Sequence, residues 1–401
     1  MRNRIGQAVE GDDRFPRPQL EEKFDTAVQS GCGATLFSLR RIGKSSEVKA
    51  LQARLREKTE HVLYLDAQGI PDEISFLNEL FKMMQKEAPP LSRRLIQFLN
   101  ENPVSIELME ILNRTLDILK RDNNSSGRTN ALHLQSISKE MLHLLKESPN
   151  KPIVIVDEFP WFCKRVVTSK GDSGLDRLET LLSWMRRWRG EGGMRMLLTG
   201  SFGLAGVLRK YNVDRSGLND LSELHVPPLT EDEAKNFLRM LAEGESSHGW
   251  TEEHTDRVLQ GLGEFYPLSL QTAFQHMHKG GSACPVCNIE AIFCDGARSA
   301  CIKPFSDQFS AKSAEYREYP KAVCTFLHIL LKAVLGGSQE ISTTDLAQLC
   351  PSPDDPLDRT DIADALDILR EDGFITVRDM ENGDRLWRPS SRLASIWWTN
   401  R

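Results

Sequence analysis

Short apolar runs alternate with segments of helical period through residues 1–228. The segments between the runs repeat apolar residues every three or four positions, as in the predicted helix at 17–30. Alternating strands and helices indicate parallel βαβ units, so we expect an α/β fold with a doubly wound parallel sheet. Five runs have the length and composition of strands: 34–37, 61–67, 153–156, 194–199 and 223–226.

Two stretches of this region depart from simple alternation. Residues 71–150 are mostly helical by period and form a predicted insertion, interrupted by the polar sequence NNSSGR at 123–128. Residues 164–174 are rich in polar residues and glycine and are predicted to form a loop.

The pattern changes after residue 228. Residues 229–280 are helical throughout, and Thr230 with Glu233 forms a predicted capping box. Residues 281–318 carry several cysteines and form a predicted connector. Residues 319–401 contain three predicted helices, then two strands around an Asn-Gly turn, which is the order of a winged helix.

Composition and charge limit the class of protein. The 401 residues are 40% apolar and 27% charged, as in ordinary globular domains, and the net charge of −6 argues against a broadly basic nucleic-acid coat. The N-terminus lacks a signal-peptide pattern, and no apolar run is long enough to span a membrane. Eight cysteines without an export signal indicate reduced thiols or metal ligands. We therefore expect a cytoplasmic protein without membrane association.

The clearest chemical motif is SLRRIGKSS at 38–46. A phosphate-binding P-loop is a strand, then GxxxxGK[ST], then a helix; its backbone amides and lysine bind phosphates and its hydroxyl binds Mg²⁺. Here Gly43, Lys44 and Ser45 match that motif between a predicted strand and helix, although Ser38 replaces the first glycine. The alternative is a chance Gly-Lys-Ser sequence at a helix start.

Two further strand ends carry polar residues. The strand at 153–156 runs into Asp157 and Glu158, the form of a Walker B strand, in which the first acid holds Mg²⁺ through water and the second activates the attacking water. A buried strand that ends in solvated acids is the simpler reading, but its coincidence with a P-loop favours nucleotide binding. Thr199 and Ser201 end the next strand and are candidate sensors of the γ-phosphate, or an ordinary turn.

The ordered set of motifs resembles the archaeal-type ATPase family of AAA+/STAND P-loop NTPases. The segments are RPQLEEKF, SLRRIGKSS, YLDAQG, IVIVDEF, LLTGS and LNDLSELHVPPLTEDEA. Members of this family often lack the first P-loop glycine, so Ser38 fits the resemblance. The resemblance covers residues 5–278 and the C-terminal winged helix. It implies a P-loop NTPase core of the ASCE/AAA+ type, a helical lid over the nucleotide and a winged helix that packs on the core.

The resemblance also implies roles for individual residues. Arg17 precedes the first helix, near the segment that relatives place beside adenine. Arg209 and Arg215 are candidates for an arginine that reaches a neighbour's nucleotide, or are solvated charges. Lys44, Asp157 and Glu158 are the expected catalytic residues, and Ser45 and Asp157 the expected Mg²⁺ ligands. The expected ATP-binding residues are Ser38, Arg40, Arg41, Ile42, Gly43, Lys44, Ser45, Ser46 and Pro267.

Four cysteines raise the question of zinc. Cys284 and Cys287 form a CxxC half-site, and a tetrahedral zinc site needs four thiolates. Cys294 and Cys301, seven residues apart, are spaced for one face of a helix rather than a second CxxC. Ordinary thiols are therefore favoured over structural zinc.

The charge of the last helix before the wing bears on DNA. A winged helix reads DNA with this helix, but RTDIADALDILRED carries Asp361, Asp364 and Asp367 along one face. That face repels phosphates, so a docking or regulatory module is favoured over a DNA reader.

Three functions follow as hypotheses. The first is an ATP- and Mg²⁺-dependent switch or assembly factor, with a protein partner at the winged helix or lid and ATP-dependent self-association. The second is a DNA-associated ATPase resembling initiator or transposition-helper proteins, and the third is a nucleotide-binding scaffold with slow or no hydrolysis. Regulatory, defence or mobile-element roles rest on analogy alone, and the sequence leaves trigger, partner and oligomeric state open.

Overall fold

The computed structural model describes most of the chain in side-chain detail. P-loop positions 38–41, the middle of the predicted insertion and several short stretches lie outside the described residues. The described residues are 1–5, 9, 11–29, 31, 33–37, 42–58, 61–88, 93, 127–170, 172–201, 203–292, 296–319, 321–337, 339–350, 359–380 and 383–400.

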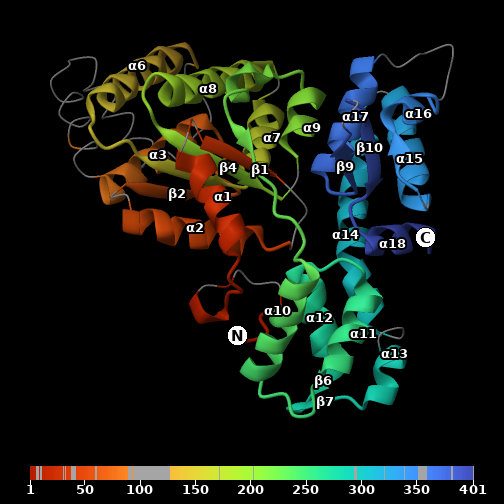
Figure 1. The fold of residues 1–401 in the computed structure, drawn as a ribbon. Coiled ribbons are helices and arrows are strands. Elements are labelled where there is room, and N and C mark those ends of the chain that lie inside the picture. The colour runs from red at the N-terminus through yellow and green to blue at the C-terminus, as the bar shows by residue number, and fades with distance from the viewer. Residues whose placement is uncertain are drawn as a thin grey trace.

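A five-stranded parallel sheet forms the centre of the first 228 residues (Figure 1). Its order is β2-β3-β4-β1-β5, so β4 separates the strand before the P-loop from the strand that ends in Asp157. The predicted α/β class and doubly wound sheet are confirmed. The strands are β1 (Gly33–Phe37), β2 (Val62–Asp66), β3 (Ile153–Asp157), β4 (Arg195–Gly200) and β5 (Ser222–Glu223).

Alternate residues of each strand face different helical layers, because successive side chains point to opposite sides of a sheet. On one face, Leu36 and Ile155 pack toward α1 (Pro18–Gln29) and α2 (Lys44–Lys58). On the other face, Val156 and its neighbours belong to a second apolar cluster. The helices that cover this second face are α3 (Glu73–Glu87), α6 (Gly127–Glu147), α7 (Phe159–Lys170), α8 (Asp172–Gly190) and α9 (Leu204–Lys210).

Helix α7 corrects one prediction. Residues 164–174 were expected to form a loop, but α7 continues to Lys170 and α8 begins at Asp172. The cause is an apolar stripe that the polar residues obscure, because Phe162, Cys163, Val166 and Val167 are all buried against the sheet.

Three helices form a separate unit below the sheet in Figure 1. They are α10 (Glu231–Gly244), α11 (Glu252–Leu262) and α12 (Pro267–Met277), and we call them the helical unit. The predicted capping box is present, because the Thr230 hydroxyl accepts from the Glu233 amide and the Glu233 carboxylate accepts from the Thr230 amide. Pro267 occupies the first turn of α12, where its missing amide hydrogen costs nothing.

The predicted cysteine-bearing connector is largely one long helix. Helix α14 spans Arg298–Tyr316. It follows the short hairpin β6 (His278–Lys279) and β7 (Ser282–Ala283), the 3-10 turn η3 (Val286–Asn288) and α13 (Ile289–Ile292). In Figure 1, α14 runs from the helical unit to the C-terminal part of the chain.

The elements after α14 make up what we call the C-terminal unit. Its three short strands form an antiparallel sheet of order β8-β10-β9, and α17 leads into the β9–β10 hairpin. Trp397 is buried and its ring centre lies 5.2 Å from that of Phe309 on α14, as expected for a packing tryptophan. The elements are α15 (Lys321–Gly336), β8 (Ile341–Ser342), α16 (Thr343–Ala347), α17 (Arg359–Glu371), β9 (Ile375–Asp379), β10 (Arg385–Pro389) and α18 (Arg392–Thr399).

Charged side chains join the C-terminal unit and α14 to the core. Arg209 of α9 binds Asp361 at 2.6 Å and also Asp364, both on α17. Gly203, before α9, lies so close to Glu371 that a Cβ there would overlap that side chain. We call these contacts the docking interface. Its charged residues are Lys164, Arg209, Lys210 and Glu223 on the core and Glu315, Glu318, Asp361, Asp364 and Arg370 opposite.

Within the described residues, no helix is both long and apolar enough to cross a membrane.

Candidate functional site

The start of α2 forms one wall of the site. Gly43 has φ of 101°, a conformation that favours glycine, and α2 begins at the next residue, Lys44. Lys44 is buried, and Ser45 and Ser46 follow it in the first turn, where backbone amides have no partner within the helix. This turn is suited to binding an anion.

Asp157 forms the opposite wall, at the end of β3. The Tyr64 hydroxyl of β2 donates to Asp157 Oδ2 at 2.9 Å. The Thr199 hydroxyl donates a short hydrogen bond to Oδ1, which also accepts from the Glu158 amide at 3.0 Å. Both carboxylate oxygens are therefore fixed by neighbouring groups before any ligand binds.

Glu158 is held by Ser201. Its φ of 54° is unusual for a residue other than glycine. The Ser201 hydroxyl donates to Glu158 Oε2 at 2.8 Å, and the Ser201 amide approaches the same atom at 3.3 Å. Backbone strain of this kind gathers at functional sites.

The placement of β4 explains why Thr199 and Ser201 reach the two acids. Because β4 lies between β1 and β3, its carboxyl end meets both the P-loop side and the acidic side. Thr199 is only 1% exposed and contacts Asp157, whereas Ser201 contacts Glu158 and lines the cavity described below.

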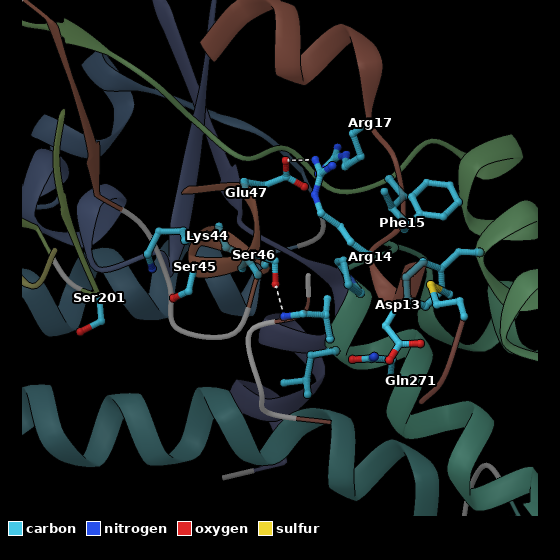
Figure 2. A pocket seen from close by; sticks show the side chains of 18 of the residues that line it. Asp13, Arg14, Phe15, Arg17, Lys44, Ser45, Ser46, Glu47, Ser201 and Gln271 are labelled. Atoms are coloured by element: carbon cyan, nitrogen blue, oxygen red, sulfur yellow. Dashed lines mark hydrogen bonds and ion pairs between the residues drawn. The ribbon is translucent and has the colours of Figure 1, made fainter. Parts of the chain in front are cut away.

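The N-terminal segment closes the site beside α2 (Figure 2). Arg14 makes ion pairs of 2.7 Å with Glu47 and 2.6 Å with Glu21, and Val9 donates its amide to the Ser46 hydroxyl at 3.1 Å. Burial raises the pKa of Glu47, while Arg14 opposes that shift. Sequence reasoning missed Arg14 and Glu47, because neither stands in a phosphate or metal motif.

An aromatic pair joins this segment to the helical unit. Phe15 packs edge-on against Phe237 of α10, with ring centres 5.4 Å apart. Arg17, which the sequence had singled out, is 5% exposed, and burial lowers its pKa. It donates to the Pro228 carbonyl at 3.2 Å, and its Nε has no partner among the described residues.

These walls enclose one cavity of about 330 Å³. Its volume lies at the lower end of the range of small-molecule sites. One side is polar, from α2 and the two acids, and the other is largely apolar, from Phe15, Leu229 and Phe237. Among the predicted residues, it brings together Ile42, Gly43, Lys44, Ser45, Ser46, Asp157, Glu158, Ser201 and Pro267.

Some predicted residues lie elsewhere. Arg209 faces α17 across the docking interface, and Arg215 begins the 3-10 turn η2 (Arg215–Leu218); neither lines the cavity. Ser38, Arg40 and Arg41 lie outside the described residues.

The described cysteines do not support the zinc hypothesis. Cys301 is buried in the apolar core, where burial raises the pKa of its thiol to about 12, and it contacts the Ser269 carbonyl. Cys287 is exposed, and Cys284 is half-buried. Cys294 lies outside the described residues, and among the others no group of three or more His, Cys, Asp or Glu side chains is arranged to hold a metal. A thiol buried among apolar side chains is a poor zinc ligand, because it resists ionisation.

No protein-family model and no curated protein sequence matches the chain. Solved structures do match. The Walker-type ATPase PABY2304 of Pyrococcus abyssi is 15% identical, with a TM-score of 0.54 and 100% of both chains covered. The Aeropyrum pernix ORC2 protein is 16% identical (TM-score 0.43, 95% of this chain and 91% of that chain), and Cdc6p of Pyrobaculum aerophilum is 12% identical (TM-score 0.38, 99% and 95%).

The first likeness shows the fold. The whole chain shares the fold of that Walker-type ATPase, and the predicted P-loop NTPase fold is confirmed.

Proposed function

We propose that this protein is an Mg²⁺-dependent ATPase that works as a nucleotide-dependent switch. The observation that carries the proposal is the single cavity that joins Lys44 and Ser45 at the start of α2 to Asp157 and Glu158 at the end of β3. A buried lysine, a helix N-terminus and two acids at the carboxyl edge of a parallel sheet are the groups that nucleotide hydrolysis needs.

Each group has a role in this proposal. Lys44 and the amides of the first turn of α2 bind the β- and γ-phosphates. A bound Mg²⁺ would neutralise part of the phosphate charge. The Ser45 hydroxyl and the Asp157 carboxylate both line the cavity, and such oxygen ligands suit Mg²⁺. Glu158 orients the attacking water and accepts its proton.

Ser201 controls where Glu158 points. Its hydroxyl and amide both donate to Glu158 Oε2, so the carboxylate is hydrogen-bonded to the residue that follows β4. For Glu158 to accept a proton from water, the Ser201 contact must weaken or shift. Hydrolysis therefore depends on the position of the carboxyl end of β4.

The docking interface supplies a reason for that position to change. Helix α9 starts three residues after Ser201, and α17 holds α9 through Arg209 and through close packing at Gly203. Release of α17 would free α9 and, through it, Ser201. Docking of the C-terminal unit thus changes how readily Glu158 can accept a proton from water.

The proposal assigns parts of the chain to this switch. Residues 1–228 are the P-loop core, 229–280 a lid over the nucleotide, 281–318 a connector and 319–401 a winged-helix unit. The order of helices, strand and hairpin in the C-terminal unit supports the winged-helix assignment, as does its three-stranded antiparallel sheet. The lid and C-terminal unit are the surfaces that a protein partner or a second copy would bind.

Nucleotide binding is tested with Lys44→Ala. A fluorescent ATP analogue should bind the wild type in the presence of Mg²⁺ and bind the variant at least about a hundredfold more weakly, as expected for loss of a buried charged contact to phosphate. Lys49→Ala, a half-buried lysine one turn further along α2, is the matched control. Tight binding by Lys44→Ala, with the same fold by circular dichroism, would refute the site.

Hydrolysis is tested separately. Glu158→Gln should retain ATP binding and lose turnover by a factor of roughly 10²–10⁴, the usual contribution of a general base. A variant that turns over ATP like an active wild type would refute the role of Glu158. A wild type without measurable turnover would leave only a nucleotide-binding scaffold.

The DNA-associated alternative makes a different prediction. In the structure, Asp361 and Asp364 of α17 face Arg209, so this helix is not presented to a DNA groove while docked. If duplex DNA stimulates ATP turnover with a steep inverse dependence on salt, the alternative is preferred.

A further inference from the structure

Asp157 offers two oxygens, and the hydrogen bonds around them are unequal. Oδ1 accepts from both the Thr199 hydroxyl and the Glu158 amide. A carboxylate oxygen has about two acceptor positions. Oδ1 is therefore fully used by the protein.

Oδ2 accepts from Tyr64 alone among the described residues, at 2.9 Å. Counting partners among the described residues, one acceptor position is left on Oδ2, and Asp157 lines the cavity. Any water that Asp157 holds must therefore bind through Oδ2, whose orientation depends on Tyr64.

The sheet places Tyr64 for this task. Tyr64 pairs with Ile155 across β2 and β3, so Asp157 is its diagonal neighbour, two residues further on the same face. Diagonal neighbours on one face lie within reach of an aromatic side chain.

We propose that Tyr64 is a positioning residue for the metal, because it fixes Asp157 Oδ2 so that this oxygen accepts a hydrogen bond from Mg²⁺-bound water. The proposal rests on the proposed function, since it concerns the same site. The segment YLDAQG begins at Tyr64, but the sequence assigned this residue no role at the site. Its role differs from that of Thr199, which donates to the other carboxylate oxygen, Oδ1.

The test measures Mg²⁺ dependence of nucleotide binding rather than turnover. Binding of a fluorescent ADP analogue is titrated against Mg²⁺ for the wild type and Tyr64→Phe. The variant should need about tenfold more Mg²⁺ for half of the metal-dependent gain in affinity, the typical effect of losing a partner of a metal-binding group. Its binding without Mg²⁺ should be unchanged, which also shows that it is folded.

Tyr316→Phe is the matched control. Tyr316 donates to Asp372 Oδ2 at 2.8 Å, a hydrogen bond of nearly the same kind and length as that of Tyr64. It joins α14 to the end of α17, and neither residue lines the cavity. This variant should leave the Mg²⁺ midpoint unchanged. An equal shift in Tyr316→Phe, or none in Tyr64→Phe, would overturn the proposal.

A double variant tests whether Tyr64 acts through Asp157. Asp157→Asn alone should weaken Mg²⁺ dependence, and adding Tyr64→Phe should change it by less than twofold. A further tenfold shift in the double variant would show that Tyr64 acts independently, against the proposal. If the wild type itself binds the nucleotide without any effect of Mg²⁺, the proposed function fails first, and this inference fails with it.

Discussion

The C-terminal unit, together with α14, contacts the rest of the molecule in two places whose chemistry differs. Toward the helical unit, the contact is apolar, because Phe274 of α12, Phe305 and Phe309 of α14 and Trp397 of α18 belong to one buried cluster. This cluster also includes Leu36 and Ile155 of the core sheet. Toward the core, the docking interface is made of ion pairs and hydrogen bonds, such as Lys164–Glu315 at 2.6 Å and the Tyr319 hydroxyl on the Gly206 carbonyl at 2.8 Å.

The two apolar clusters of the molecule do not merge at the docking interface. Leu204 and Val207 of α9 belong to the cluster beneath the sheet, whereas Ile368 of α17 belongs to the other cluster. A polar interface between domains is typical of contacts that open, and an apolar one of contacts that persist. We therefore expect the C-terminal unit to stay with the helical unit when its contact with α9 opens.

The largest effect is expected on the apolar side. Phe309→Ala removes a ring that packs against Phe374, Trp397 and Trp398, with ring centres 5.2–6.0 Å apart. Truncation of a buried phenylalanine costs about 3–5 kcal/mol. We expect the C-terminal unit to unfold first in a denaturant titration monitored by tryptophan fluorescence. An unchanged midpoint would show that this contact is not part of the persistent body.

A smaller and different effect is expected at the docking interface. Arg209→Glu places a third carboxylate beside Asp361 and Asp364 and costs about 2 kcal/mol, between the values for exposed and buried pairs. That energy shifts the ratio of docked to released molecules roughly thirtyfold. Amide hydrogen exchange should speed up in α9 and α17, while α15 stays protected.

Two further variants sharpen this prediction. Arg378→Glu breaks an exposed pair with Glu340 inside the C-terminal unit and should leave exchange in α9 unchanged. Adding Asp361→Lys and Asp364→Lys to Arg209→Glu should restore protection. If the rescue fails while the protein remains folded, charge is not what holds α17 on α9.

The sequence predicted the parts of this molecule that depend on local pattern. Apolar runs gave the strands, and Gly43-Lys44-Ser45 and Asp157-Glu158 marked the cavity, because each motif is contiguous. The partners of these residues could not be predicted. Tyr64 precedes Asp157 by more than ninety residues, and Arg209 and Asp361 are about 150 apart; no local signal distinguishes such pairs from solvated side chains. The acidic face of α17 was recognised, but its partner required the fold.

The smallest expected effect concerns a carboxylate at the junction of all three parts. Glu264, just before α12, lines a second cavity of about 370 Å³ together with Ile42 of the P-loop, Arg370 of α17 and Arg388 of β10. Its Oε2 is buried without a hydrogen-bond partner among the described residues, and burial raises its pKa from 4.5 to about 7, opposed by Arg388. The other charged or titratable groups that line this cavity are Glu223, His225, Tyr266 and Glu371.

The sign of the pH dependence follows from this raised pKa. A carboxyl whose pKa is higher in the folded protein contributes stability that is complete below about pH 4.5 and is lost as the pH rises through about 7. Glu264→Gln cannot ionise, so its thermal midpoint minus that of the wild type should grow between pH 5 and pH 7 and level off above. His225 and the other groups are common to both proteins and cancel in this difference. Because Glu264 lies where the core, helical unit and C-terminal unit meet, the same variant should also slow amide hydrogen exchange in α17 at pH 8. If the difference in thermal midpoint does not change with pH, Glu264 is solvated and its charge does not affect the opening of this junction.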